Sequence, residues 1–186
     1  MLGYRVCGPR KSLLTDVRAG NLDAVLNVMT QHDAFEDWPW PLVYRQAYET
    51  YGEAARFILT VRKDEDAWFR SIEQHGYGTD PLKSMKTAYG YYRPFGRKKE
   101  FVEIYREHNA AVRAYFADKP HVFTEFCLEK GDGWEKLCNL LGQVAPIGQP
   151  TPHSNKTIAG RKVMNRMLNK TIALIYSRLP KPQREV

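Results

Sequence analysis

The chain has 186 residues, of which 43% are hydrophobic and 26% are charged, and this balance indicates one folded domain and excludes disorder throughout. Lysine and arginine outnumber aspartate and glutamate by 28 to 21, but eight basic residues and one acidic residue lie from position 156 onward, so residues 1–155 are neutral. A body without a basic excess argues against nucleic-acid binding, and apolar stretches of a few residues exclude a membrane-spanning helix.

The chain alternates β-rich runs with amphipathic segments, which predicts an α/β fold with a mostly parallel sheet. Asn21 is the expected N-cap of one helix, and another is predicted from Pro39 to about Tyr51. The apolar, β-branched run at residues 56–61 predicts a strand buried on both faces. The other expected strands are residues 3–7, 34–36 and 121–126.

Further helices are predicted after the 56–61 strand. Asp66 to about His75 is one expected helix, and Asp80 and Pro81 have the form of an N-cap and first residue of a helix that runs to about Tyr92. Apolar spacing predicts a long helix over residues 98–117, and a shorter one from Trp134 ends at Gly142. We therefore divide the chain into a domain over 1–143, a proline-rich linker over 144–157 and a basic amphipathic helix within 158–186.

Several motifs of catalytic and cofactor-binding sites do not occur in this sequence. None of the patterns HExxH, GxSxG, GxGxxG and GxxxxGK[ST] is found. The three cysteines, Cys7, Cys127 and Cys138, are far apart and form no CxxC pair, which predicts neither a disulfide framework nor a structural zinc site. We therefore expect a cytoplasmic protein.

One stretch has the residues of an anion site. Arg62 directly follows the 56–61 strand, a short acidic turn comes next, and Ser71 lies early in the following helix. Ligands of open α/β sheets bind beyond the carboxyl ends of strands, where a guanidinium and a hydroxyl can hold a phosphate. The alternative is that Arg62 pairs with Asp64 or Asp66 while Ser71 faces solvent.

Four segments together resemble the P-loop-fold sulfotransferases. They read DWPWPLVY, FILTVRKDEDAWFRS, YREHNAAVRAYF and GWEKLCNLLG, and occupy residues 37–44, 57–71, 105–116 and 133–142. The resemblance implies a parallel sheet of the P-loop nucleoside-triphosphate-hydrolase type with flanking helices. It also implies transfer of a sulfonate group from 3′-phosphoadenosine-5′-phosphosulfate (PAPS) to a hydroxyl or amine of a small-molecule or glycan acceptor, with no metal.

The resemblance also implies roles for individual residues. A strand-end arginine and a helix serine hold the 3′-phosphate of PAPS in this family, and Arg62 and Ser71 take those positions here. Their separation is one residue longer than is usual in the family, and the turn between them lacks the usual proline. Asp37 is the candidate base for the acceptor hydroxyl, with Glu36 as a rival. Alternatively, Asp37 stabilises the start of the next helix, where negative charge is favourable.

Members of this family start with a structural unit that this chain lacks, and the resemblance begins just after that unit. That unit is a strand, a glycine-rich loop around the 5′-phosphosulfate and a helix, and Met1-Leu-Gly-Tyr-Arg-Val follows its end. The first strand and phosphate loop are thus missing from this sequence. We expect either part of a longer protein or a natural remnant, inactive as written. The alternative function is a non-catalytic module that binds through its basic C-terminal helix.

That C-terminal helix has an apolar stripe that includes Met164, Met167, Leu168 and Ile172. The stripe can dock on the body of the protein. A cationic helix with an apolar face also suits an anionic membrane surface. The third possibility is contact with nucleic acid or a protein partner. The sequence leaves these three alternatives and the oligomeric state open.

Overall fold

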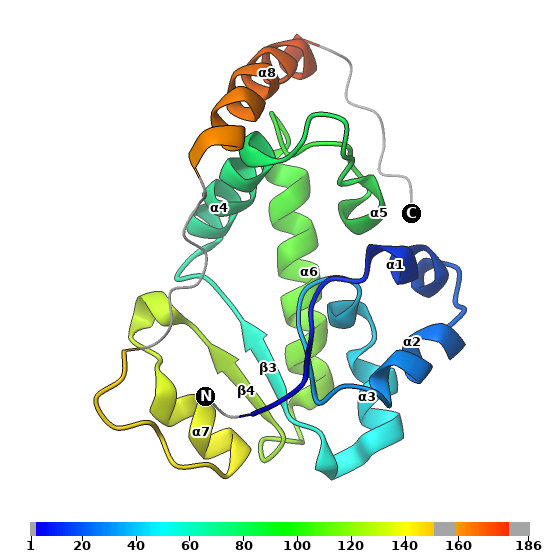
Figure 1. Ribbon diagram of the computed structural model, residues 1–186, viewed down its shortest axis with the longest axis vertical. Helices are drawn as coiled ribbons and strands as arrows, with labels where there is room; N and C mark the ends of the chain where they lie inside the picture. The colour runs from blue at the N-terminus through cyan, green and yellow to red at the C-terminus, as the bar shows by residue number, and fades with distance from the viewer. Residues whose placement is uncertain (1–2, 151–158, 179–186) are drawn as a thin grey trace. The chain divides into compact units, whose positions relative to one another are not determined.

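The structure is a computed structural model that describes residues 3–150 and 159–178 (Figure 1). It has a mixed α/β fold in which two small parallel sheets lie among helices. The chain divides into two compact units, Met1–Ala55 and Arg56–Val186. The predicted α/β class with parallel strand pairing is confirmed at this level. Residues 151–157 of the predicted linker lie outside the described residues.

The first unit contains one parallel strand pair and its helices. Strand β1 pairs with β2 so that Val6 lies opposite Ala34 and Cys7 opposite Phe35. The elements are β1 (Val6–Cys7), α1 (Lys11–Arg18), α2 (Asp23–Met29), β2 (Ala34–Phe35), the 3-10 turn η1 (Trp40–Leu42), α3 (Tyr44–Tyr51) and the 3-10 turn η2 (Gly52–Ala54). A small core unites them, made of Cys7, Val25, Met29, Trp40 and Val43 with partly buried neighbours.

Two helix predictions in this unit need correction. Helix α2 begins at Asp23 after Leu22, and no side chain caps it, so the expected N-cap at Asn21 is wrong. The backbone N–H of Asn21 instead donates to the carbonyl oxygen of Asp16 at the end of α1, a helix that the sequence reading missed. The single helix expected from Pro39 is divided into η1 and α3, because prolines in this stretch supply no N–H for a helical ladder.

The second unit is built on the parallel pair of β3 and β4. The register runs from Phe57 opposite Phe123 to Thr60 opposite Phe126. The elements are β3 (Phe57–Thr60), α4 (Glu65–Gly78), α5 (Lys86–Tyr89), α6 (Lys98–Phe116), β4 (Phe123–Phe126), the 3-10 turn η3 (Leu128–Lys130), α7 (Trp134–Leu141) and α8 (Ala159–Arg178). The helices α4 to α6 form the connection between the two parallel strands.

Helix α6 lies against one face of this strand pair. The buried ring of Phe116 sits 4.7 Å from that of Phe57 and stacks on that of Phe123 at 5.0 Å between ring centroids. Leu59, on the same face as Phe57, is buried as well, whereas Ile58 on the opposite face is 39% exposed. The prediction that this strand is buried on both faces is therefore wrong, because α6 covers only one of them.

The helix predicted from Asp80 to about Tyr92 is mostly absent. Only α5 forms there, and Asp80 caps a turn by accepting a hydrogen bond from the N–H of Leu82 at 3.0 Å. The buried guanidinium of Arg93 donates to the carbonyl oxygens of Asp80 and Pro81, both at 2.8 Å. The carbonyl oxygen of Asp80 also accepts from the N–H of Lys83 at 3.0 Å, so the chain forms a turn here and α5 begins only at Lys86.

Helix α8 docks on the C-terminal end of α4 through asparagines. The fully buried Asn169 donates from Nδ2 to the carbonyl oxygens of Tyr77 at 3.0 Å and Thr79 at 2.7 Å. Asn165 donates to the carbonyl oxygen of Gly78 at 3.3 Å. The helix thus supplies donors to carbonyls at a helix end, which have no partner within their own helix.

This docking tests the first of the three alternatives for the C-terminal helix. The helix does lie against the body, but Met164 and Met167 of its apolar stripe are 62% and 65% exposed. The expectation that this stripe makes the contact is therefore wrong for these side chains. Within residues 3–150 and 159–178, no helix combines the length and apolarity that crossing a bilayer requires.

We expect Asn169→Ala to lower the free energy of unfolding by about 2 kcal/mol, because two hydrogen bonds of about 1 kcal/mol each are lost at a buried position. Chemical denaturation monitored by circular dichroism measures the change. Asn165→Ala is the matched control and should cost less, since one longer bond is lost at a less buried position. Equal stability of Asn169→Ala and the original chain would contradict the described docking.

Candidate phosphate-binding site

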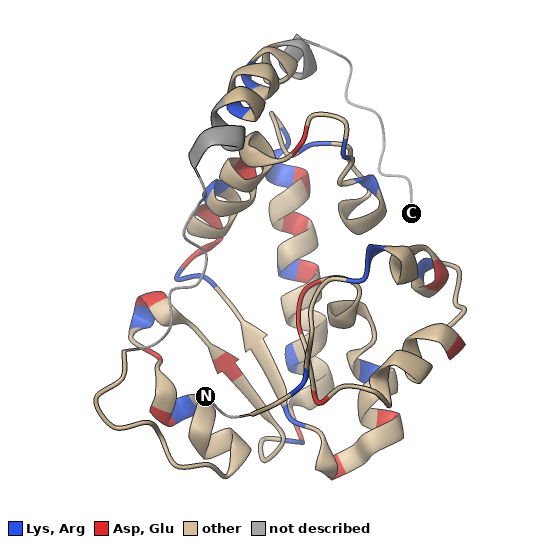
Figure 2. Ribbon diagram, viewed as in Figure 1, with Lys and Arg blue, Asp and Glu red and all other residues tan. Residues whose placement is uncertain are grey.

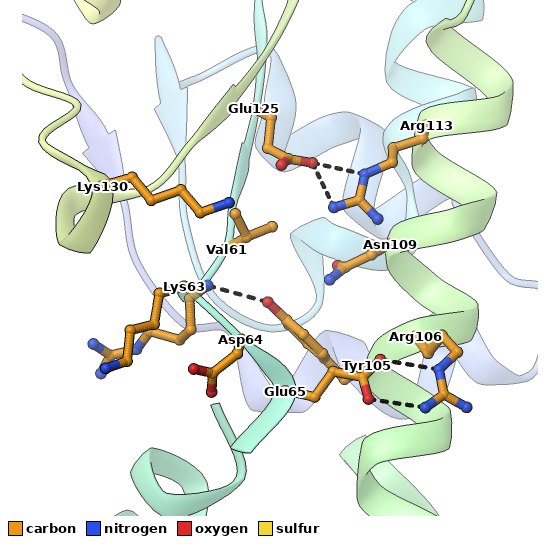
Figure 3. Close-up of a pocket in the computed structure, with 11 residues that line it drawn as sticks. Val61, Lys63, Asp64, Glu65, Tyr105, Arg106, Asn109, Arg113, Glu125 and Lys130 are labelled. Atoms are coloured by element: carbon orange, nitrogen blue, oxygen red, sulfur yellow. Dashed lines mark hydrogen bonds and ion pairs between the residues drawn. The ribbon is translucent and has the colours of Figure 1, made fainter. Parts of the chain in front are cut away.

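A polar cavity of about 190 Å³ lies at the carboxyl ends of β3 and β4, beside α6 (Figure 3). Parallel strands end at the same edge of their sheet, so the residues that follow them meet there. The cavity is lined by Val61, Arg62, Lys63, Asp64, Glu65, Tyr105, Arg106, Asn109, Arg113, Glu125 and Lys130. Five of these residues are cationic and three are acidic, which gives the lining a positive balance.

Arg62 and Ser71, the two residues expected to hold a phosphate, are in direct contact. The Nη2 group of Arg62 donates to the hydroxyl oxygen of Ser71 at 2.8 Å, between the end of β3 and the second turn of α4. Because the serine oxygen accepts this bond, its own O–H can donate to an anion. The alternative in which Ser71 merely faces solvent is wrong.

Glu129 holds the other side of Arg62. Its Oε1 accepts from Nη1 of Arg62 at 3.2 Å, and its Oε2 accepts from the backbone N–H of Lys63 at 2.8 Å. One carboxylate thus bridges a guanidinium and a backbone donor at the strand end. The two side chains of the ion pair are 44% and 31% exposed, so the pair is weak enough to be exchanged for another anion.

The acidic turn after the strand does not pair with Arg62. Asp64 caps α4 by accepting a hydrogen bond from the N–H of Ala67 at 2.6 Å. Asp66 forms an ion pair with Lys98 at 2.9 Å, and this hydrogen bond lowers the pKa of its carboxyl. The alternative pairing of Arg62 with Asp64 or Asp66 is therefore wrong, and the arginine's carboxylate partner is Glu129.

A second arginine of the cavity, Arg106, forms ion pairs with two glutamates. Arg106 donates from Nε and Nη2 to the two oxygens of Glu65 at 2.9 and 2.8 Å, and from Nη1 to Glu103 at 3.1 Å. The hydrogen bonds from Arg106 lower the pKa of the Glu65 carboxyl. All three nitrogens of Arg106 thus have acceptors, which distinguishes this arginine from Arg62.

Helix α6 supplies a row of side chains that the sequence reading did not assign to a site. Tyr105, Asn109 and Arg113 follow one another at four-residue spacing, so they share one face of the helix, and Figure 3 shows them directed toward the cavity. The hydroxyl of Tyr105 accepts from the backbone N–H of Arg62 at 3.1 Å. Trp68 stacks on Tyr105 at 4.4 Å between ring centroids, which fixes the tyrosine ring. The four-residue spacing of these side chains is the feature of the sequence that could have assigned them to one site.

Asp37, the candidate base, lies in the first unit. It follows β2 with a positive φ of 64°, a conformation that aspartate tolerates better than most residues. Its exposed carboxylate accepts a hydrogen bond at Oδ1 from the N–H of Trp38 at 2.8 Å, and its carbonyl oxygen accepts from the N–H of Trp40 at 3.0 Å. The side chain therefore has a structural role in the turn.

Two further observations concern metals and cysteines. In the part of the chain that the structure describes, no three side chains of histidine, cysteine, aspartate or glutamate come together as a metal site. Cys7, Cys127 and Cys138 are buried free thiols. Burial also lowers the pKa of His108, which lies next to Asn109 on α6.

The chain matches the model of a protein family. The model of a family described as "Sulfotransferase domain" matches residues 10–159, which is most of the chain and includes β2, the pair of β3 and β4, and the cavity. A comparison with curated proteins gives no match.

Proposed function

Because this chain belongs to the sulfotransferase family, whose activity is the transfer of sulfonate groups, we propose that its cavity at the end of β3 binds the 3′-phosphate of PAPS. The observation that carries the proposal is the contact between Arg62 and Ser71, which orients a charged and an uncharged donor at a strand end. These are the residue types that suit a phosphate, since a guanidinium can hold two of its oxygens.

Glu129 provides independent support for an anion at this place. Its carboxylate spans the Arg62 guanidinium and the Lys63 N–H. A phosphate presents more acceptor oxygens and more negative charge than a carboxylate, so it can replace Glu129 on both donors. The ammonium of Lys130, which points into the same cavity in Figure 3, would add to the attraction.

The proposal also covers the sulfonate donor, the acceptor and the group that takes the acceptor proton. PAPS would supply the sulfonate group, and a hydroxyl or amine of a small-molecule or glycan acceptor would receive it. Asp37 is our candidate for the group that takes the acceptor proton, at Oδ2, because Oδ1 is engaged by the N–H of Trp38. We also retain the P-loop type of sheet and the division at residues 143 and 158 as proposals.

Binding of adenosine 3′,5′-bisphosphate to the 186-residue chain, measured by isothermal titration calorimetry, tests the proposal. Adenosine 5′-phosphate is the comparison ligand because it lacks only the 3′-phosphate. We expect the bisphosphate to bind more tightly. Equal affinity for the two nucleotides would contradict a 3′-phosphate site on this chain.

We expect Glu129→Gln to raise the affinity for adenosine 3′,5′-bisphosphate by about two- to fivefold, because an exposed ion pair with Arg62 no longer competes with the phosphate. The same titration measures the change. Glu103→Gln is the matched control, since it removes the same charge while Arg106 keeps its two bonds to Glu65. Weaker binding by Glu129→Gln would show that the carboxylate supports the site instead of competing for it.

A further inference from the structure

Helix α8 has its polar and apolar faces in an unusual arrangement. The face against α4 carries the buried Asn169 and the partly buried Asn165. Met164, Met167 and Leu168, spaced so that they share another face, are 62%, 65% and 50% exposed. The helix thus uses asparagines for its contact with the body and leaves three large apolar side chains in water, a cost that a second binding surface can offset.

The charge of this helix is equally one-sided. The chain has no acidic residue between Glu135 and Glu185, whereas eight basic residues lie from position 156 onward. Arg166 and Lys170 are exposed on α8, close in sequence to the apolar side chains, and Figure 2 shows blue and no red on its described part. The partner of this face must therefore accept both apolar side chains and positive charge.

We propose that α8 binds the surface of an anionic lipid bilayer, with Met164, Met167 and Leu168 at the boundary of headgroups and acyl chains. Arg166 and Lys170 would contact lipid phosphates. An amphipathic helix with a cationic side lies in the plane of such an interface. The described helix is not apolar enough to cross the bilayer, which agrees with a position on its surface.

A second copy of the chain is a poorer partner for this face. The whole formal charge of +7 comes from residues 156–186, so pairing two such helices would bring like charges together. Anionic lipid has the opposite sign and attracts the same residues. The bonds of Asn165 and Asn169 to α4 hold the helix with its apolar face turned outward, ready for the lipid surface.

Co-sedimentation of the full chain with vesicles tests this inference. One vesicle set contains phosphatidylserine and phosphatidylcholine, and the other contains phosphatidylcholine alone. We expect binding to the anionic set, with strong weakening when salt is raised to about 0.5 M, because added ions screen the attraction.

Two sets of variants separate the apolar and charged contributions. Replacing Met164, Met167 and Leu168 together by serine should weaken binding to the anionic vesicles by about tenfold or more, since buried apolar area drives insertion. The matched control carries serine at three other exposed apolar positions, Leu82, Val144 and Ile147, and should bind like the original chain.

The charge variant Arg166→Gln with Lys170→Gln should reduce the preference for anionic over neutral vesicles, whereas Lys83→Gln with Lys99→Gln, at exposed positions elsewhere, should not. Circular dichroism checks that every variant keeps its helical content. Binding that is absent, equal for both vesicle types, or unchanged by the triple serine variant would overturn the proposal. Self-association that the triple variant abolishes, without vesicle binding, would assign the face to a second copy.

Discussion

Arg62→Ala is expected to weaken the binding of adenosine 3′,5′-bisphosphate by about 10- to 150-fold, because a charged hydrogen bond to phosphate contributes about 1.5–3 kcal/mol. The guanidinium is held at the end of β3 by Ser71 and Glu129, so the unbound protein already has it in place. Isothermal titration calorimetry of the variant and the original chain measures the loss. Binding of adenosine 5′-phosphate should change little, since it lacks the phosphate at issue.

Three further variants make this result specific. Arg106→Ala removes the same charge from the same cavity, but its nitrogens are engaged by Glu65 and Glu103, so the loss should be much smaller. Ser71→Ala should cost about 0.5–1.5 kcal/mol, as for an uncharged hydrogen bond. Arg62→Lys should recover only part of the affinity, because an ammonium cannot reproduce a two-pronged contact. If Arg62→Ala weakened both nucleotides alike, the arginine would serve the fold or another phosphate.

Phe116→Ala is expected to lower the free energy of unfolding by about 3–5 kcal/mol, the usual cost of emptying a buried phenylalanine site. The ring lies between Phe57 of β3 and Phe123 of β4 and joins α6 to the strand pair. Its loss leaves a cavity at the amino-terminal end of the strand pair, where Phe57 and Phe123 lie. Chemical denaturation monitored by circular dichroism measures the change.

Leu82→Ala is the control for this substitution. Leu82 is 88% exposed in the second unit, so the change should stay within about 0.5 kcal/mol. A loss below about 1 kcal/mol for Phe116→Ala would contradict the described packing of α6 on β3 and β4.

Part of the site could be predicted because it is local in sequence. Strand β3, a short turn and helix α4 follow one another directly, so a β-rich run and an amphipathic period were sufficient to place Arg62 at the strand end and Ser71 in the next helix, whereas the cap by Asp64 was not predicted. The long helix α6 and the end of α7 at Gly142, which has a φ of 62°, were predicted for the same reason. These features depend on hydrogen bonds between residues a few positions apart.

Other features depend on residues far apart in the chain. The partner of Arg62 is Glu129, 67 positions later, and it reaches the arginine because parallel β4 ends at the same edge as β3. Where a helix was expected after Asp80, the chain forms a turn whose carbonyl oxygens at Asp80 and Pro81 accept hydrogen bonds from Arg93, 13 and 12 positions later. Composition and period contain no signal for such contacts.

The C-terminal helix α8 has both kinds of feature, some predictable from its own residues and some that depend on contacts with distant parts of the chain. Its existence and charge were evident from the sequence, since both are properties of residues 158–186 alone. Which face it turns to the body was not, because an apolar stripe ordinarily docks inward. In the structure, carbonyl oxygens at the end of α4 accept hydrogen bonds from Asn165 and Asn169. The asparagine face of α8, and not its methionines, therefore contacts the body. The sequence therefore determined the helix, and only the tertiary structure decided that its methionines face outward, since satisfying buried carbonyls requires donors that an apolar face lacks.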